Sequence, residues 1–193
     1  MVEKKYPARF ICKTPGSLSP PTAEIIFSAY GVKMEDFKSW GGSATFASPE
    51  AITATLRDGR ADFTIDVVPP GHPAVSELAM TADVRFISLT AKERAKLNER
   101  GLQNVIMAPE SFKGQKKEIQ TVTPGTVLIA NENVSAELAY AVTKTICEGR
   151  EELVKAHASI SPFDPPTAWK PEKVGIPLHP GAAKYYRDRG WMK

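Results

Sequence analysis

Short apolar runs alternate with helical patterns over residues 8–89. The runs predicted to be strands are residues 8–12, 36–40, 61–68 and 84–89. Between them, apolar residues fall on one helical face at residues 20–30, 49–58 and 74–80. Connections of this length favour parallel pairing over hairpins. The pattern predicts an α/β fold with a mainly parallel sheet, helices on both faces and right-handed crossovers.

Helical signals dominate the rest of the chain. Thr90 and Glu93 form a capping box for a charged helix that ends near Arg100, and Ser135 caps the longest helix, which ends near Glu148. We expect further helices at residues 150–157 and 182–189, strands at 104–107 and 121–130, an exposed loop or hairpin at 111–120 and a proline-rich extended strap at 159–177.

Residues 8–31 form the unit around which we expect the chain to be organised. A strand leads into a Gly/Ser turn, and the following helix opens with Pro20 and Pro21. The free N–H groups and positive dipole end of such a helix suit a small anion. The alternative is an ordinary strand-to-helix connection.

Ligands of open parallel sheets bind beyond the carboxyl ends of the strands. The residues predicted to line that edge all follow the predicted strands and are mostly glycines and serines. They are Gly16, Ser17, Ser19, Trp40, Gly41, Gly42, Ser43, Val68 and Pro69. Trp40 is equally consistent with a place in the core. Asp66 suits either a ligand ammonium group or neighbouring turn amides, and His72 fits a turn better than a ligand contact.

The composition is that of an ordinary globular protein, with 193 residues, 42% of them hydrophobic and 24% charged. The net charge of +3, with scattered basic residues, argues against a nucleic-acid partner. No apolar run is long enough to span a bilayer. Residues 1–10 lack the apolar core of a signal peptide, which leaves a cytoplasmic protein or a mature or shortened chain.

Motifs of catalysis and metal binding are absent from the sequence. It contains neither the G-x-S-x-G frame, nor a Walker lysine after the glycine turn, nor G-x-G-x-x-G. Cys12 and Cys147 have no metal-ligand spacing, so we expect buried free thiols, with a single disulfide as the alternative in an oxidising compartment. The sequence therefore favours binding over catalysis and requires neither a metal nor a cofactor.

Several motifs, in order along the chain, resemble one family. They are the turn P-G-S at residues 15–17 with A-Y-G at 29–31, L-R-D-G-R-A-D at 56–62, P-A-V-S-E-L-A at 73–79, and P-L-H-P-G-A with Y-Y-R at 177–187. The chain resembles the TAXI-type solute-binding proteins (TRAP-associated extracytoplasmic immunogenic proteins) of tripartite ATP-independent periplasmic (TRAP) transporters. Leu18 and Ser19 depart from it, because the family usually has Gly-Thr there.

The resemblance implies a periplasmic-binding-protein-like lobe of type II, located in the periplasm. Residues 1–118 would form the ligand-binding lobe, and residues 119–193 the return segment and C-terminal helices of an otherwise missing lobe. The ligand would be a small organic anion, such as glutamate or another carboxylate, and the partners would be the TRAP membrane subunits. Three explanations of the missing part stay open: truncation, a shortened gene, or a homodimer whose copies exchange their C-terminal parts.

Two other classes of function stay open from the sequence alone. The first is a stand-alone sensing module of the same fold, which would need a signalling partner. The second is an enzyme that uses Cys12 or His72, although neither lies in a recognisable catalytic frame. The resemblance favours a non-enzymatic binding protein over both.

Overall fold

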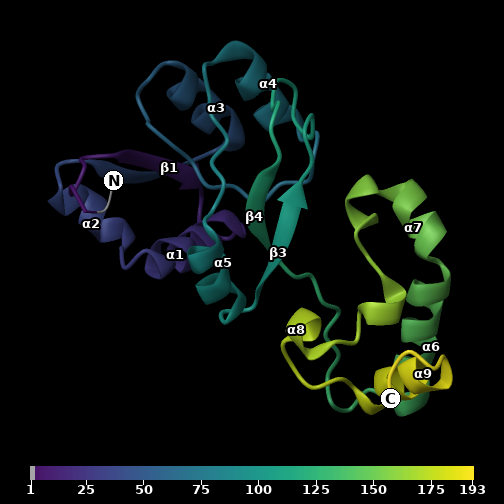
Figure 1. Cartoon of the computed structure of the whole chain (residues 1–193). Coiled ribbons are helices and arrows are strands. Elements are labelled where there is room, and N and C mark those ends of the chain that lie inside the picture. Colours follow the sequence, from purple (N-terminus) through teal and green to yellow (C-terminus); the bar gives the residue numbers. More distant parts are fainter. Residues whose placement is uncertain (1–2) are drawn as a thin grey trace. The chain divides into compact units, whose positions relative to one another are not determined.

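The computed structural model describes residues 3–193, apart from the side chain of residue 158. The chain forms two compact units, Met1–Pro124 and Gly125–Lys193 (Figure 1). The N-terminal unit contains β1 (Arg9–Lys13), α1 (Ser19–Ala29), α2 (Met34–Ser39), β2 (Ser43–Ala47), α3 (Pro49–Arg57), α4 (Pro73–Thr81), α5 (Ala91–Asn98), β3 (Leu102–Met107) and β4 (Ile119–Pro124). The C-terminal unit contains α6 (Ala136–Glu148), α7 (Arg150–Ala156), η1 (Ala158–Ile160), η2 (Pro165–Thr167), α8 (Pro171–Val174) and α9 (Pro180–Asp188).

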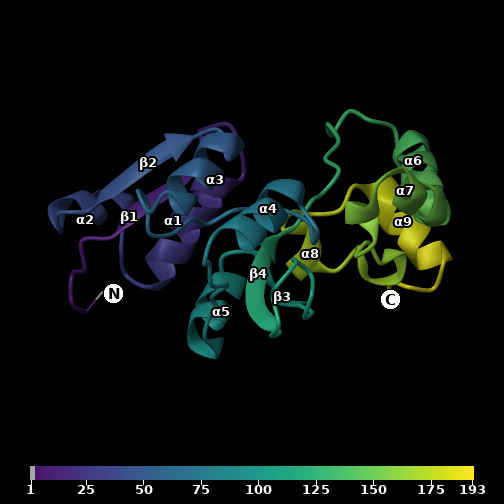
Figure 2. The same cartoon turned by 90° about the horizontal axis from the view of Figure 1, so that it is seen from above.

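Strands β1 and β2 pair in parallel, so the fold is mixed α/β as predicted. Arg9 pairs with Ser43 and Lys13 with Ala47, and the two strands lie side by side (Figure 2). A third segment runs alongside β1 through one parallel bridge between Phe10 and Phe63. There the Ile11 N–H donates to the Phe63 carbonyl at 3.1 Å, and the Asp62 N–H donates to the Arg9 carbonyl at 2.8 Å.

Both faces of β1 are covered, because its side chains alternate between two apolar clusters. Phe10 and Cys12 are fully buried against residues of α1 and α2. Around Phe10, the ring centroids of Phe27 and Phe63 lie at 5.0 and 5.1 Å. Ile11 points the other way and packs with Ile52 of α3. This arrangement explains the unbroken apolar run that predicted the first strand.

The predicted four-stranded parallel sheet is wrong in its extent. The described residues form two sheets of two strands each, β1 with β2 and an antiparallel pair of β3 with β4. Residues 61–68 form one bridge rather than a ladder, and residues 84–89 form no strand. The predicted strand at 121–130 is displaced, since β4 ends at Pro124.

The predicted strand at residues 36–40 is also wrong. These residues belong to helix α2 and its C-terminal cap, and the strand follows it as β2. The helix begins because the Asp36 side chain accepts a hydrogen bond from the Lys33 N–H at 2.8 Å. The aromatic residues Phe37 and Trp40 gave this stretch the composition of a strand.

The remaining elements join α1 to the antiparallel strands. Leu97 of α5 and Leu102 of β3 are buried against Ile26 of α1. The α5 side chain Lys96 donates to the Ala29 carbonyl at 2.7 Å, which satisfies an end of α1. The start of α5 is as predicted, because the Thr90 hydroxyl accepts from the Glu93 N–H at 3.4 Å.

The C-terminal unit is built on the contact between α6 and α9. Cys147 of α6 is buried against Tyr185 and Tyr186 of α9, as predicted for a free thiol. The predicted strap at residues 159–177 is wrong as an extended segment, because it contains η1, η2 and α8. Its Phe163 and Trp169 do pack against this cluster.

His179 and Gly181 hold α9 against α6. The His179 ring accepts the Gly181 N–H at Nδ1 (3.2 Å), and its Nε2 lies 3.0 Å from the Val134 carbonyl oxygen. Nε2 therefore carries the proton in the neutral ring. A Cβ on Gly181 would lie 2.1 Å from the Ala136 carbonyl oxygen, so only glycine fits this helix contact.

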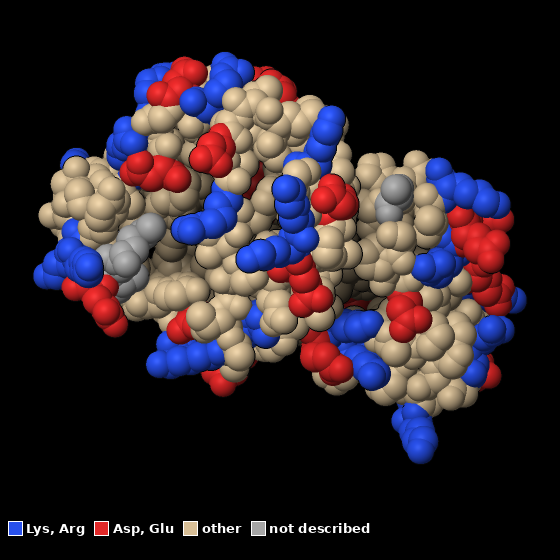
Figure 3. Space-filling view, turned by 45° about the horizontal axis from the view of Figure 1, so that its top comes forward, with Lys and Arg blue, Asp and Glu red and all other residues tan. Residues whose placement is uncertain are grey.

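No helix in residues 3–193 is long and apolar enough to cross a membrane. Basic and acidic side chains are mixed on the face shown in Figure 3, so the net charge of +3 is not concentrated there.

We expect Gly181→Ala to lower the free energy of unfolding of the C-terminal unit by about 1–3 kcal/mol, because the added methyl group overpacks the α6–α9 contact. Elsewhere in a helix, the change from Gly to Ala stabilises by about 1 kcal/mol. Urea unfolding measures the difference, and Ala141→Gly on the exposed side of α6 is the control for the ordinary helix-propensity effect. A more stable Gly181→Ala variant would contradict the proposed close contact.

Candidate functional site

The carboxyl ends of β1, β2 and the bridged segment meet at one edge of the N-terminal unit. Lys13 ends β1 beside Ala47, which ends β2. Asp66 lies three residues beyond Phe63, the residue that bridges Phe10. Parallel strands end at a common edge, and this edge is where ligands of open α/β sheets bind.

The turn after β1 presents small and polar groups at this edge. Gly16 has a φ of +99°, a left-handed conformation that favours glycine. The Ser17 hydroxyl donates to the Thr14 carbonyl at 3.0 Å and keeps its lone pairs for another donor. Leu18 is 57% exposed although it is apolar. The turn therefore presents the polar hydroxyl of Ser17 beside the exposed apolar side chain of Leu18.

Helix α1 offers fewer amide donors than the sequence suggested. Pro20 and Pro21 have no N–H group, and the Thr22 N–H donates to the Leu18 carbonyl at 3.2 Å. Within residues 3–193, no protein acceptor takes the N–H groups of Leu18 and Ser19. Because Ser19 is 1% exposed and Leu18 is 57% exposed, an anion at this helix end would find the Leu18 N–H and the positive end of the helix dipole.

Asp66 forms the most connected group of the edge. Its Oδ1 accepts from the Ser19 hydroxyl at 2.6 Å and from the Val67 N–H at 2.8 Å. The same oxygen forms an ion pair with Lys13 Nζ at 2.9 Å. Ser19 is 1% exposed, so its hydroxyl is committed to Asp66 rather than free for a ligand. The Ser19 hydroxyl, predicted to donate to an anion, donates to Asp66 in this structure.

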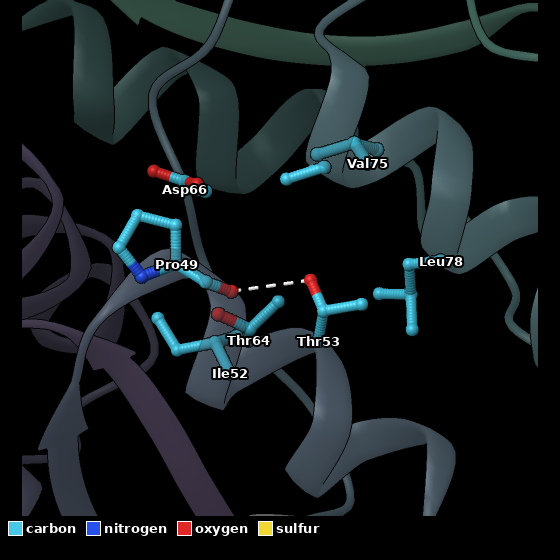
Figure 4. Close-up of a pocket in the computed structure, with 8 residues that line it drawn as sticks. Pro49, Ile52, Thr53, Thr64, Asp66, Val75 and Leu78 are labelled. Atoms are coloured by element: carbon cyan, nitrogen blue, oxygen red, sulfur yellow. Dashed lines mark hydrogen bonds between the residues drawn. The ribbon is translucent and has the colours of Figure 1, made fainter.

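A cavity of about 30 Å³ lies beside Asp66, between α3 and α4 (Figure 4). Its lining is mostly apolar, from Pro49, Ile52, Ala74, Val75 and Leu78, with polar atoms of Thr53, Thr64 and Asp66. The Thr53 hydroxyl donates to the Pro49 carbonyl at 3.1 Å, the bond drawn in Figure 4. The volume is about that of one water molecule, so the cavity is too small for an organic solute.

The predicted site residues fall into two groups. Gly16, Ser17 and Ser19 lie at the carboxyl edge, and Val68 and Pro69 follow Asp66 in the chain. The other group, Trp40, Gly41, Gly42 and Ser43, precedes or begins β2 and lies at the opposite end of the strands. Ser43 and Ala47 are four residue steps apart along β2, or about 13 Å. One small ligand cannot contact both groups.

Packing explains the second group. The Trp40 ring lies edge-on to Phe37 with centroids 5.8 Å apart, at the rim of the aromatic core. A Cβ on Gly42 would lie 2.1 Å from the Ala8 carbonyl oxygen, so this glycine permits close approach of two backbone segments. Both residues thus have structural roles in the N-terminal unit.

Sequence reasoning placed Lys13 at the carboxyl end of the first strand but missed Ser48 and Pro49 as residues of this edge. Ser48 and Pro49 begin α3 directly after β2, and the Ser48 hydroxyl accepts from the Ala51 N–H at 3.4 Å. The sequence did contain a signal for these two residues. The helix start at Ser48 and Pro49 was recognised, and a strand that leads into this helix has to end immediately before it.

His72 stands before α4, and its buried Nδ1 has no hydrogen-bond partner within residues 3–193.

Cys12 of β1 is fully buried in the aromatic core, one residue before Lys13 at the carboxyl edge. Burial, with the negative charges of Asp66 and Glu24, raises the pKa of its thiol to about 11. Burial likewise raises the pKa of Cys147. Both thiols therefore stay protonated and unreactive at neutral pH.

We expect neither cysteine to react with a thiol reagent such as DTNB in the native protein at pH 8. With a pKa of about 11, Cys12 is thiolate in only about one molecule in a thousand at that pH. The same assay in concentrated guanidinium chloride should titrate both thiols of each chain. Rapid modification of Cys12 in the native state would show that this core is open.

A comparison with known families shows the family to which the chain belongs. The model of a family described as the NMT1-like family matches residues 14–190, most of the chain. The chain therefore belongs to the NMT1-like family. This is a family of solute-binding proteins with a periplasmic-binding-protein fold, not of enzymes, and its members bind small molecules, typically outside the cytoplasm.

Proposed function

We propose that this member of the NMT1-like family is the TAXI-type solute-binding subunit of a TRAP transporter. Its ligand is a small organic carboxylate held at the carboxyl edge of β1. Gly16, Ser17, Val68 and Pro69 surround the ligand, and Ser19 positions Asp66 beneath it. The bound form would be presented to the TRAP membrane subunits after closure of a two-lobed clamp.

The start of α1, with the amide donor of the exposed Leu18, is the observation that supports this site best. The N–H groups of Leu18 and Ser19 take no protein acceptor within the described residues, and they lie at the positive end of an eleven-residue helix. Lys13 adds an ammonium group to the same edge, with its side chain 19% exposed. A carboxylate is the small ligand group that these donors suit.

Motif positions support the TAXI assignment. The P-G-S turn at residues 15–17 stands at the candidate site, and residues 56–62 lead from the end of α3 into the bridged segment. There Asp62 pairs with Arg9, whose guanidinium lowers the pKa of the carboxyl.

We expect Leu18→Glu to abolish carboxylate binding while leaving the fold intact. The new carboxylate would face the ligand at the amide donors, and like charges there should weaken binding at least about tenfold. A glutamate at a helix start favours folding by about 0.3–1 kcal/mol, and Leu18 is exposed, so the variant should remain stable.

Thermal unfolding with a panel of small carboxylates, including L-glutamate, glutarate and succinate, measures the effect. Ile106→Glu on β3 is the matched control, because Ile106 is 62% exposed and lies outside the proposed site. Equal ligand-induced shifts in wild type and Leu18→Glu would place the anion elsewhere. The absence of any shift in the wild type would reject binding of these carboxylates.

A further inference from the structure

The cavity between α3 and α4 is bordered by a buried hydroxyl group that has no partner among the described residues. The cavity has a volume of about 30 Å³, and Thr64 is one of its lining residues (Figure 4). The Thr64 Oγ1 atom is buried and makes no hydrogen bond within residues 3–193. An unpaired buried hydroxyl costs free energy, so most such groups in folded proteins have a partner, which is either a protein atom or an ordered water molecule.

Two further polar groups border the same cavity and can accept hydrogen bonds. Thr53 is 6% exposed, and its hydroxyl donates to the Pro49 carbonyl at 3.1 Å, which leaves the hydroxyl oxygen as an acceptor. Asp66 Oδ1 already accepts from Ser19 and Val67, whereas Oδ2 accepts no hydrogen bond from the residues that the structure describes. The lining thus combines one hydroxyl that can donate with two groups that can accept.

The volume and the lining of the cavity determine which occupant it can hold. A space of about 10–15 Å³ for a water-sized probe is enough for one water molecule, and buried waters typically make about three hydrogen bonds. A divalent cation needs about six oxygen ligands or more. Here most of the lining is apolar, and Lys13 already pairs with the Asp66 carboxylate at 2.9 Å. Water therefore suits this cavity better than an ion does.

We propose that one ordered water molecule occupies this cavity and bridges Thr64 to Thr53 and Asp66. The Thr64 hydroxyl donates to the water, and the water donates its two protons to the Thr53 hydroxyl oxygen and the Asp66 carboxylate. The water thereby joins α3 to the segment that follows the bridge at Phe63, and it adds a hydrogen bond to those that Asp66 already accepts. This water site does not depend on the proposed carboxylate ligand, because all its partners are protein groups.

A crystal structure of the full chain, at a resolution that shows ordered waters, tests the site directly. We expect electron density within about 3.2 Å of Thr64 Oγ1 and of at least one of the two acceptors, Thr53 Oγ1 and Asp66 Oδ2. A cavity without density would overturn the proposal, and so would a Thr64 hydroxyl that donates to a protein atom. Contacts of about 2.4 Å to several oxygens would indicate a cation and would overturn it too.

Thr64→Val tests the water through stability, because the two possible states of the cavity predict opposite signs. Valine is close to threonine in shape but cannot donate to the water. The variant should therefore lose a net hydrogen bond, and the constant for opening of the N-terminal unit should rise about twofold to tenfold. In a dry cavity the same change removes an unpaired buried hydroxyl, and the opening constant should fall instead.

Protection of the β1 amides in native-state hydrogen exchange, measured by mass spectrometry, reports the opening constant of this unit. Thr121→Val is the matched control, because Thr121 is half-buried in β4 of the same unit and does not line the cavity. Protection that rises in Thr64→Val, or that falls no further than in Thr121→Val, would contradict the water bridge. If Thr64→Val does not fold, the crystal structure of the wild type decides.

Discussion

The parallel alignment of β1 with the segment around Phe63 is the constraint on which the N-terminal unit depends. Burial of Phe10 among the rings of Phe27, Phe37 and Phe63 sets that alignment, because a shift by one residue would turn Phe10 to the opposite face. The same register places Lys13 beside Asp66. The packing of Phe10 in the core thus determines that the charged side chains of Lys13 and Asp66 meet at the carboxyl edge.

The two prolines at the start of α1 reduce the number of backbone N–H groups that the carboxyl edge can offer to an anion. Helix starts usually bind anions through several backbone donors, whereas Pro20 and Pro21 leave only the N–H groups of Leu18 and Ser19. Side chains must then supply more of the recognition. The ion pair of Lys13 with Asp66 lies at this end of the sheet. In the proposed site, these two side chains would therefore supply part of the recognition that the backbone does not.

Helix starts could be predicted from the sequence because they depend on neighbouring residues. The pairing of strands could not, because it depends on residues far apart in the chain. Ser48, Thr90 and Ser135 each accept a hydrogen bond from the N–H three residues onward, so these helix starts are encoded within one turn. Residues 61–68 and 84–89 have the composition of strands, but a ladder also needs a partner in register along its length. Leu89, for example, donates to Gln120 without forming a strand.

The same reasoning explains which of the predicted site residues lie at the expected end of the sheet. Gly16, Ser17 and Ser19 follow a correctly placed strand, so they were found at its carboxyl edge. Trp40 to Ser43 were assigned to that edge because a helix was mistaken for the strand, which reversed the end at which they lie. Asp66 was predicted to contact either a ligand ammonium group or neighbouring turn amides, and it does accept from the adjacent Val67 N–H. Its contacts with Ser19 and Lys13 could not be predicted, because both residues are distant in sequence and the contacts depend on the alignment of β1.

The C-terminal signature at residues 177–187 has a structural role and contributes no residue to the candidate ligand site of the N-terminal unit. His179 and Gly181 of the C-terminal signature join α9 to α6 through a ring nitrogen, a carbonyl and a backbone contact that admits no side chain. Packing of this kind tolerates few substitutions, whereas the exposed Leu18 can vary without loss of fold. A resemblance that rests on the signature therefore identifies the scaffold and carries no information about which solute is bound.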